Sequence, residues 1–464
     1  MRFIGRNYEL AELNKEFYND KFAMSVIYGR RRVGKTYLIQ EFIRDKKGSY
    51  FVALESNDIV NLSLLSKAVY HACGNLSGLP DFTNFEDAFR YLFEFSIGNR
   101  IVFVIDEYPY LAMSTPYISS LLQNLVDEYK EKSKLFLILC GSSMSFMEEQ
   151  VLGYKSPLYG RRTSQFKIHP FNYLDSAKFV ESYSSREKAI VFGLTNGIAE
   201  YLTFFNSDIS LKQNIINNYL KTSGRLYEEP ANLLKQELRE PKTYNDILFA
   251  ISSGASKLNE IATKLNVPSG GLSHYINSLI ALGIIERKTP VLNRKTKRPI
   301  YAIKDTMFVF WYKFVQTNLN MINLDLGELV YEKYVDPYIN NYMGSVFEKI
   351  TIEYFEERLK QMNSPLIPVD YGNWWGNDQR LKKESEIDMI AYNNENEYLF
   401  VEAKWNNSKV KQTILNELIE KSLNFQFSKA TYWLTSLSGF EKITHDNNVE
   451  LIELSDMYRC GEDK

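Results

Sequence analysis

The first third of the chain alternates short, almost wholly apolar runs with amphipathic stretches. The apolar runs cover residues 23–28, 49–54, 100–108 and 134–143, and the stretch 36–45 has helical spacing. Strands buried on both faces of a parallel sheet read as continuous apolar runs, and alternation of such strands with helices produces that sheet. The pattern therefore predicts an α/β domain with a parallel sheet covered by helices on both faces.

The pattern changes further along the chain. From about residue 175 to 235 it is helical and has no strand-like runs. From about 240 to 305, three helical segments precede two strands around a basic turn, which is the layout of a winged helix-turn-helix. From about 335 a second, smaller α/β unit is expected, with helices at 342–360 and 409–424 and strands at 385–393, 397–405, 430–436 and 449–454.

The first apolar run leads directly into a glycine-rich loop, YGRRRVGKTY at 28–37. Gly29 lets the chain turn off the strand, and Gly34 lets backbone N–H groups approach phosphates closely. Lys35 reaches the β and γ phosphates, and Thr36 ligates Mg²⁺ through its hydroxyl. A helix N-terminus, which favours anions, follows the loop. The residues predicted to bind ATP here are Gly29, Arg30, Arg31, Arg32, Val33, Gly34, Lys35, Thr36 and Tyr37.

Two acids follow the third apolar run. Asp106 is expected to act on the Mg²⁺, and Glu107 to orient and polarise the attacking water. The presence of both carboxylates favours hydrolysis over binding alone, and the alternative is that they simply end a strand. Ser142, at the end of the fourth run, can sense the γ-phosphate.

Arg161 and Arg162 lie on an expected loop after these strands. One of them can stabilise developing phosphate charge, either within the chain or across a subunit interface. Action across an interface would require a homo-oligomer. The alternative is that both arginines are solvated surface residues.

Several of these segments together resemble the archaeal-type ATPases of the AAA+/STAND group over roughly residues 1–235. The resemblance implies that Gly5 and Arg6 lie beside the adenine and that the Gly197 segment belongs to a helical lid. This chain has Ala199 and Glu200 where that family usually shows proline and arginine. The segments that carry the resemblance are FIGRNYEL at 3–10, GRRRVGKT at 29–36, VIDEYPYL at 104–111, SPLYGRRT at 156–163 and TNGIAEYL at 195–202.

The winged-helix segment has a basic wing. Ser269 is expected to cap the recognition helix after Pro268, and Ser269, Ser273, His274 and Asn277 are expected to point outward. Clustered cations on a two-stranded wing suit DNA phosphates. The alternative is a protein-docking module with a solvated basic turn. The wing cations are Arg287, Lys288, Arg294, Lys295, Lys297 and Arg298, and with Ser269 and Ser273 they form the predicted DNA-binding set.

The C-terminal segment carries a second group of acids. Asp388 lies on one expected strand, and Glu402 and Lys404 alternate on the next, so the last two share a face. An Asp with Glu-x-Lys on adjacent strands can hold Mg²⁺, with the lysine activating a water for phosphodiester attack. Glu348, on the preceding helix, is placed to join them as a metal ligand.

This arrangement resembles the PD-(D/E)xK nucleases. The segments NWWGND, SEIDMIA and VEAKW resemble more closely the C-terminal domain of unknown function, DUF234, that is commonly fused to archaeal-type ATPases, over about 335–464. The alternative is a retained fold whose acids form a structural salt bridge or an inert pocket.

Composition limits the function less than the motifs do. The 464 residues have a formal net charge of -2, so any contact with nucleic acid must come from local patches. The three scattered cysteines indicate neither a disulfide framework nor a thiolate zinc site. The start of the chain lacks the apolar core of a signal peptide, and no run approaches the roughly 18 apolar residues of a membrane span. We therefore expect a cytoplasmic protein without a membrane partner.

Together these features predict a Mg²⁺-dependent ATPase whose nucleotide state controls a DNA-binding winged helix and a metal-dependent nuclease-like domain. The alternative is an ATP-driven regulatory switch, in which the winged helix binds a protein or the chain's other domains and the nuclease-like domain is inactive. The expected domains are a P-loop ATPase core at 1–175, a helical lid at 176–238, a winged helix-turn-helix at 239–305, a helical linker at 306–334 and a small restriction-endonuclease-like α/β domain at 335–464.

Overall fold

The chain divides into two compact units. Unit 1 consists of Met1–Pro170 with Ile198–Glu200, and unit 2 consists of Phe171–Gly197 with Tyr201–Lys464. The computed structural model describes residues 3–74, 79–295, 299–378, 380 and 382–460. Two of the predicted wing cations, Lys297 and Arg298, lie outside these residues.

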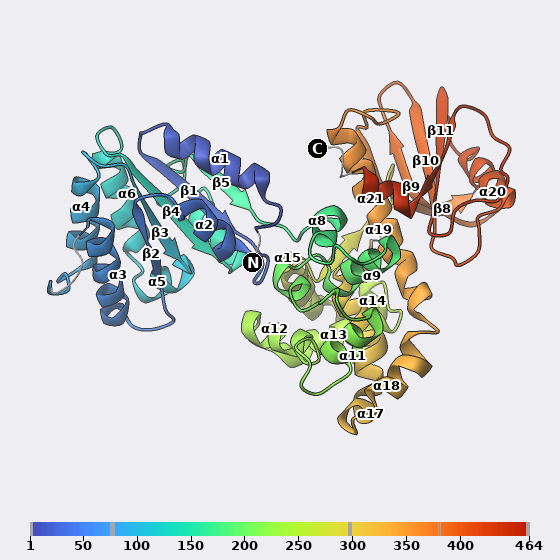
Figure 1. Cartoon of the computed structure of the whole chain (residues 1–464), viewed down its shortest axis with the longest axis horizontal. Helices are drawn as coiled ribbons and strands as arrows, with labels where there is room; N and C mark the ends of the chain where they lie inside the picture. Colours follow the sequence, from blue (N-terminus) through green and yellow to red (C-terminus); the bar gives the residue numbers. More distant parts are fainter. Residues whose placement is uncertain (1–2, 75–78, 296–298, 379, 381, 461–464) are drawn as a thin grey trace. The chain divides into compact units, whose positions relative to one another are not determined.

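Unit 1 is built on a five-stranded parallel sheet, which confirms the predicted fold class (Figure 1). Its strand order is β2-β3-β4-β1-β5, so β4 separates β1 from β3. The fifth strand was not predicted, because it lies at the sheet edge and is more polar than the others. The strands are β1 (Ala23–Tyr28), β2 (Gly48–Val52), β3 (Ile101–Asp106), β4 (Leu135–Gly141) and β5 (Ser164–Lys167).

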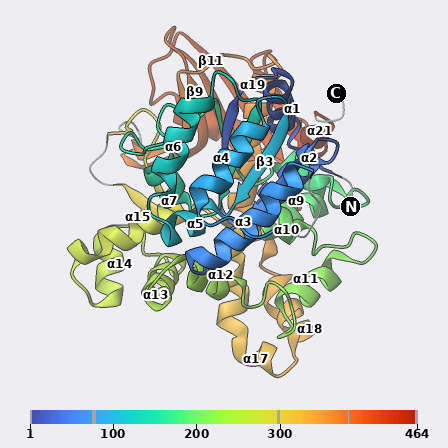
Figure 2. The same cartoon turned by 90° about the vertical axis from the view of Figure 1, so that its left-hand side faces the viewer.

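Helices cover both faces of this sheet. On one face, Met24 and Val26 of β1 belong to a core with α3, α4 and α6, the layer that faces the viewer in Figure 2. On the other face, the ring of Phe136 meets that of Phe42 in α2 at 5.6 Å. The helices are α1 (Asn7–Tyr18), α2 (Lys35–Ile43), α3 (Asp58–Ala72), α4 (Phe85–Phe95), α5 (Tyr108–Ser114), α6 (Ile118–Tyr129) and α7 (Met144–Phe146), with a π-helical turn at Met147–Val151.

Unit 2 begins with short helices and continues with three helices and a hairpin in the segment where a winged helix was predicted. The hairpin strands β6 (Ile285–Lys288) and β7 (Ile300–Ile303) are antiparallel. The preceding helices are α8 (Tyr173–Ala177), α9 (Ser185–Thr195), α10 (Ala199–Leu202), which starts in unit 1, α11 (Leu211–Tyr219), α12 (Glu229–Glu237), α13 (Pro241–Ser252), α14 (Leu258–Leu265) and α15 (Ser273–Ala281).

The prediction that Ser269 caps the recognition helix was wrong. Ser269 opens a 3₁₀ turn, Ser269–Leu272, and α15 starts only at Ser273 with Leu272 in the N-cap position. Gly270 and Gly271 fall inside that turn, and glycine is a poor helix former. The predicted outward face is otherwise present, because Ser273, His274 and Asn277 are exposed.

The C-terminal part of unit 2 holds a mixed five-stranded sheet in the order β12-β11-β10-β9-β8. Strands β8, β9 and β10 pair antiparallel, whereas β10, β11 and β12 pair parallel. Strand β8 was not predicted, because its glycines and polar residues form no apolar run. The strands are β8 (Asp370–Asp378), β9 (Lys383–Tyr392), β10 (Glu397–Lys404), β11 (Lys429–Ser436) and β12 (Val449–Glu453).

One helix lies on each face of this sheet. Trp433 of β11 contacts Phe355 of α19 on one face, and Leu415 and Leu418 of α20 pack with Phe400 on the other. The remaining helices of unit 2 are α16 (Thr306–Phe310), α17 (Leu319–Asn323), α18 (Gly327–Val330), α19 (Ile339–Lys360), α20 (Gln412–Ser422) and α21 (Leu454–Arg459), with π-helical turns at Trp311–Val315 and Tyr331–Val335 and a 3₁₀ turn at Gln316–Asn318. Within the described ranges, every helix is too short or too polar to cross a membrane.

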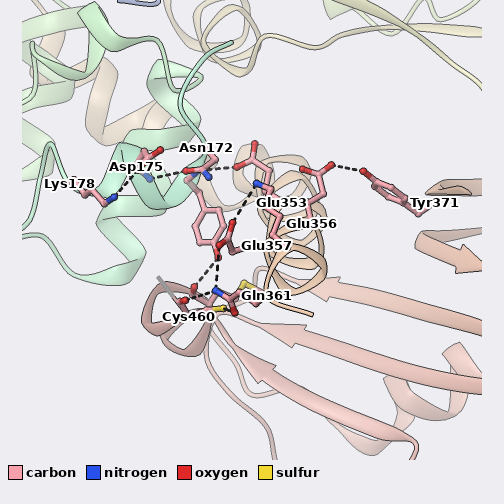
Figure 3. A network of polar contacts seen from close by, with 12 residues as sticks. Asn172, Asp175, Lys178, Glu353, Glu356, Glu357, Gln361, Tyr371 and Cys460 are labelled. Atoms are coloured by element: carbon pink, nitrogen blue, oxygen red, sulfur yellow. Dashed lines mark hydrogen bonds and ion pairs between the residues drawn. The ribbon is translucent and has the colours of Figure 1, made fainter. Parts of the chain in front are cut away.

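Helix α8 is fixed to α19 and α21 by a polar network (Figure 3). The backbone N–H of Tyr173 donates to Oε2 of Glu353 over 2.9 Å, and the Tyr173 hydroxyl donates to the carbonyl of Met457 over 2.8 Å. Gln361, which follows directly after α19, donates to the carbonyl of Cys460 over 3.0 Å. Tyr173 is fully buried, so the start of unit 2 is anchored in its C-terminal domain.

Glu353 makes the stability of this network depend on pH. Burial raises the pKa of Glu353 to about 7, against the opposing influences of Lys349 and of the N–H of Tyr173. The pKa is higher in the folded chain than in the unfolded chain, so this group's stabilisation is complete at acid pH and is lost as the pH rises through about 7.

We predict that Glu353→Gln removes this loss and still accepts the Tyr173 N–H. We compare the thermal-unfolding midpoint of the variant with that of the natural chain at each pH. The difference should shift in favour of the variant from pH 5 to pH 8, by a change equivalent to roughly 1–3 kcal/mol in the free energy of unfolding. Thermal melts at several pH values measure this, with the exposed Glu328→Gln as a matched control. Parallel pH curves for Glu353→Gln and the natural chain would contradict the prediction.

Candidate functional site

The predicted phosphate loop follows β1 and opens α2, as its sequence indicates. Gly34 has φ 94°, a left-handed conformation that favours glycine. A side chain at Gly29 would place its Cβ 2.4 Å from the carbonyl oxygen of Ile168, so only glycine fits there. The Nζ of Lys35 donates to the carbonyls of Gly29 and Arg30, over 2.8 and 3.1 Å. The backbone of the loop thus curves around the ammonium group of Lys35.

Asp106 is connected to the loop across the intervening strand β4. Thr36 Oγ1 donates to Asp106 Oδ2 over 3.2 Å, and the hydroxyl of Tyr50 donates to the same oxygen. The backbone N–H of Glu107 donates to Asp106 Oδ1 over 2.9 Å. Burial, and then the charge of Asp106, raise the pKa of Tyr50 far above its usual range, so this phenol stays a donor. The carboxylate at the end of β3 is therefore fixed close to the hydroxyl predicted to ligate Mg²⁺.

Glu107 is held by the residue expected to sense the γ-phosphate. Ser142 Oγ donates to both carboxylate oxygens of Glu107, over 2.9 and 3.0 Å. Glu107 itself has φ 51°, a left-handed conformation that is uncommon for a residue with a side chain. The two predicted residues thus meet at the carboxyl ends of β3 and β4.

The other residues predicted at the ATP site surround the loop. Arg6 donates to the carbonyl of Val33 over 3.0 Å, and the ring of Tyr37 stacks on Phe3 with centroids 5.7 Å apart. Arg31 donates to the hydroxyl of Tyr110 over 3.0 Å. These contacts attach the loop and the start of α2 to the segment before α1 and to α5.

The segment Ile198–Glu200 also lies against the loop. The Glu200 N–H donates to the carbonyl of Arg32 over 3.1 Å, and the Glu200 carboxylate is 3.7 Å from Nε of Arg32. The Cβ of Ala199 lies 3.4 Å from where a side chain on Gly34 would begin. The two positions that differ from the expected proline and arginine are therefore in contact with the phosphate loop.

The two predicted arginines have separate environments. Arg161 forms an ion pair with Asp127 of α6, with 2.7 Å between Nη2 and Oδ2, which favours a structural role for it. Arg162 lies over the ring of Tyr159, 5.7 Å from its centroid. Nη1 of Arg162 is buried and has no hydrogen-bond partner among the described residues.

In unit 2 the strands bring the predicted C-terminal acids together. Val401 of β10 pairs with Met389 of β9, and the next residues along, Glu402 and Asp388, are near enough for their charges to interact. Asp388 Oδ2 accepts the backbone N–H of Ala403 over 2.7 Å. Burial, and then the charges of Glu402 and Glu348, raise the pKa of Asp388 to about 7.

Two lysines neutralise Glu402. Nζ of Lys404 lies 2.5 Å from Oε1, and Nζ of Lys421 in α20 lies 3.2 Å from Oε2. Burial acts to lower the pKa of Lys404, but the charge of Glu402 and their hydrogen bond raise it overall. The described part of the chain holds no group of three or more His, Cys, Asp or Glu side chains arranged for a metal ion. Both carboxylate oxygens of Glu402 are therefore already paired with ammonium groups.

Asp388 and Glu348 line a cavity of about 960 Å³ that the wing helps to enclose. Its lining includes Lys288 and Asn293 of the wing together with residues of β8 and β9. Burial raises the pKa of Glu348, and the nearby Lys288 acts against this.

The wing itself is bound to the C-terminal domain. Arg294 forms a bidentate ion pair with Asp370, with 2.8 Å from Nε to Oδ2 and 2.8 Å from Nη2 to Oδ1. It also donates to the carbonyl of Tyr371 over 2.7 Å. The N–H of Val291 donates to the carbonyl of Asn373 over 2.9 Å, and Val291 is fully buried in the core of that domain. Of the other predicted DNA contacts, Arg287 and Lys295 are exposed.

Sequence reasoning missed Tyr50 and Lys421. Tyr50 is one of two residues with a hydroxyl in the strand predicted at 49–54, and it could have been noticed for that reason. Lys421 lies nineteen residues beyond Glu402 on a helix, so no local pattern connects the two. Docking of the wing through Val291 and Arg294 likewise has no local sequence signal.

Comparisons with known proteins agree with the geometry of the phosphate loop. A family model described as an ATPase domain predominantly from Archaea matches residues 3–205, and the DUF234 model, described as archaea bacterial proteins of unknown function, matches 311–415. The uncharacterized protein MJECL04 of Methanocaldococcus jannaschii is 32% identical over 424 residues, covering 90% of this chain and 92% of that protein.

A shorter relative and a solved structure match parts of the chain. The uncharacterized ATP-binding protein MJ0423 of the same organism is 44% identical over 45 residues, or 10% of this chain and 76% of that protein. The structure of the Walker-type ATPase paby2304 of Pyrococcus abyssi matches with a TM-score of 0.52 and 20% identity, covering 67% of this chain and 96% of that one. At that identity the match supports the fold.

We predict that Lys35→Ala lowers ATP hydrolysis at least about 100-fold, because the ammonium that would contact the phosphates is lost. Glu107→Gln should still bind ATP but lose hydrolysis by a similar factor. Phosphate release and equilibrium binding of a fluorescent ATP analogue measure these effects, with the exposed Lys130→Ala as a control that keeps full activity. Hydrolysis by Lys35→Ala at the rate of the natural chain would show that the site is wrongly assigned.

Proposed function

Because this chain belongs to the family of predominantly archaeal ATPases that carry a C-terminal DUF234 domain, we propose that it hydrolyses ATP with Mg²⁺ and that its nucleotide state controls the docking of the wing on the C-terminal domain. The observation that carries the first part is the hydrogen bond from Thr36 to Asp106, beside the loop closed by Lys35. The observation that carries the second part is the ion pair between Arg294 and Asp370.

The residues at the loop fit a Mg²⁺ ion. Mg²⁺ prefers oxygen ligands and is usually held by one or two protein groups together with substrate phosphates, so Thr36 and Asp106 are sufficient. Thr36 and Asp106 would hold the ion beside bound ATP, where it would supply positive charge against the negative charge that develops on the phosphates. Lys35 would exchange the carbonyls of Gly29 and Arg30 for phosphate oxygens, and Glu107 would exchange Ser142 for the attacking water.

A short stretch of chain provides the route by which nucleotide can influence unit 2. Ala199 and Glu200 lie against the phosphate loop in unit 1. A few residues earlier, in unit 2, Asn196 Oδ1 accepts from Nζ of Lys349 in α19 over 2.8 Å, and the carbonyl of Gly197 accepts from the N–H of Phe171 over 2.7 Å. A shift of the loop on binding ATP would be passed along this covalent connection to α19.

The wing is the element that we propose responds. While Arg294 is paired with Asp370 and Val291 is buried, part of the basic surface is used inside the protein and is withheld from DNA phosphates. Release of the wing would free Arg294 from Asp370 and so add it to Arg287 and Lys295, which are already exposed. We therefore propose duplex DNA as the partner of the released wing, with contacts to the phosphate backbone.

We predict that Asp370→Asn tightens binding to duplex DNA several-fold and steepens its salt dependence, because the variant releases Arg294. Fluorescence anisotropy over a range of salt concentrations measures both, with Glu395→Gln, which neutralises an exposed acid of the same domain, as the matched control. Equal affinity of Asp370→Asn and Glu395→Gln would remove the wing from the proposal.

A second candidate function, nucleic-acid cleavage by the C-terminal domain, is favoured by the nearness of Asp388 to Glu402 and by the large cavity that Asp388 lines. A metal ion would first have to displace both lysines from Glu402, so we derive no cleavage step from the arrangement described here. If the domain is inert, the chain is an ATP-driven switch that acts through its interactions.

The candidate cleavage activity predicts that the natural chain cuts DNA or RNA with Mg²⁺ or Mn²⁺ and that Glu402→Gln reduces cutting at least about 100-fold. Gel assays with and without ATP measure this, and thermal melts check that the variant is folded. If the natural chain cuts no more than Glu402→Gln, cleavage is excluded and the switch function remains.

A further inference from the structure

The carboxylate of Asp106 receives more hydrogen bonds than the predicted motif explains. Oδ1 accepts from the Glu107 N–H, and Oδ2 accepts from Thr36 and from the hydroxyl of Tyr50. Asp106 is 5% exposed, so each oxygen depends on these protein donors for its solvation. Tyr50 is the one of these donors that belongs neither to the phosphate loop nor to the pair of acids.

The strand register explains why Tyr50 reaches this point. Val52 of β2 pairs with Asp106 of β3, and Tyr50 is two residues earlier on the same strand. Side chains two apart on a strand share a face, so Tyr50 and Asp106 lie on the same side of the sheet. Asp106 is thus held from β2 by a phenol and from the loop by a hydroxyl.

We propose that Tyr50 is a positioning residue for Mg²⁺-dependent nucleotide binding, acting through Asp106. This proposal rests on the ATP site proposed above. When the oxygen of Thr36 ligates a metal ion, its proton must still point to Asp106, which requires Oδ2 to stay in place. The second donor, Tyr50, fixes that oxygen and so keeps the lone pairs of Thr36 turned toward the metal ion.

The alternative is that the Tyr50 side chain only fills space in the core. The two roles differ in whether the hydroxyl is needed, so removing the hydroxyl alone distinguishes them. Tyr50→Phe keeps the ring and removes only the donor. Tyr129→Phe is the matched control: its hydroxyl donates to Glu94 over 3.1 Å in the same unit, away from Asp106. If hydrogen bonds from a phenol to a carboxylate only stabilise the fold, removing either hydroxyl should have the same effect on nucleotide binding.

The experiment measures binding of a fluorescent ATP analogue to the whole chain in EDTA and during a Mg²⁺ titration. For Tyr50→Phe we expect affinity in EDTA within about twofold of the natural chain, and a Mg²⁺ concentration for half-maximal effect raised on the order of tenfold. Excess Mg²⁺ should restore most of the ATP hydrolysis, which it would not do for a folding defect. Tyr129→Phe should match the natural chain.

The outcomes separate the two proposals. If the natural chain shows Mg²⁺-dependent binding and Tyr50→Phe has the same Mg²⁺ requirement, the positioning role is refuted while the ATP site stands. If the natural chain binds no nucleotide under either condition, the proposed ATP site fails and the role of Tyr50 fails with it. A loss of affinity by Tyr50→Phe in EDTA as well would assign the residue to the fold of the loop, which also refutes the proposal.

Discussion

The hydrogen bond from Thr36 to Asp106 is the interaction on which the candidate ATP site depends. The two residues follow different strands, β1 and β3, and β4 lies between these strands in the sheet. The bond forms because the carboxyl ends of parallel strands lie at the same end of the sheet, where the loop after β1 can reach past β4 to β3. Tyr50 from β2 and the pair of Glu107 and Ser142 add further polar groups at that end of the sheet.

The C-terminal domain shows a different solution to buried charge. Glu402 is compensated by two ammonium groups, whereas Asp106 is compensated by neutral donors. An anion balanced by hydroxyls can still attract a metal ion, but an anion balanced by lysines has already lost most of its attraction for one. We therefore propose that the candidate ATP site can take up a cation, whereas Glu402 in the C-terminal domain is already paired with two lysines. The charge of Arg294 in the docked wing is likewise already compensated within the protein, because Arg294 pairs with Asp370 and not with an external phosphate.

The sequence predicted best where function and local geometry coincide. The loop at 28–37 and the acids at 106 and 107 lie where their spacing indicated, because strand, glycine turn and helix are local features. The pairing of Asp388 with Glu402 was also within reach, through the alternation of side chains along strands. Contacts between distant segments could not be predicted. Neither the contact of Lys421 with Glu402 nor that of Tyr50 with Asp106 follows from a periodic pattern in the sequence. The start of α15 was misplaced because two glycines, Gly270 and Gly271, weaken helix formation after a good capping residue.

The most direct test of the account is a structure of the Glu107→Gln chain determined with ATP and Mg²⁺. The account predicts the triphosphate on the 28–37 loop, Nζ of Lys35 moved from the carbonyls of Gly29 and Arg30 to phosphate oxygens, and the hydrogen bond between Thr36 and Asp106 retained. A nucleotide bound elsewhere, or a Lys35 still bonded to those carbonyls beside bound ATP, would contradict it.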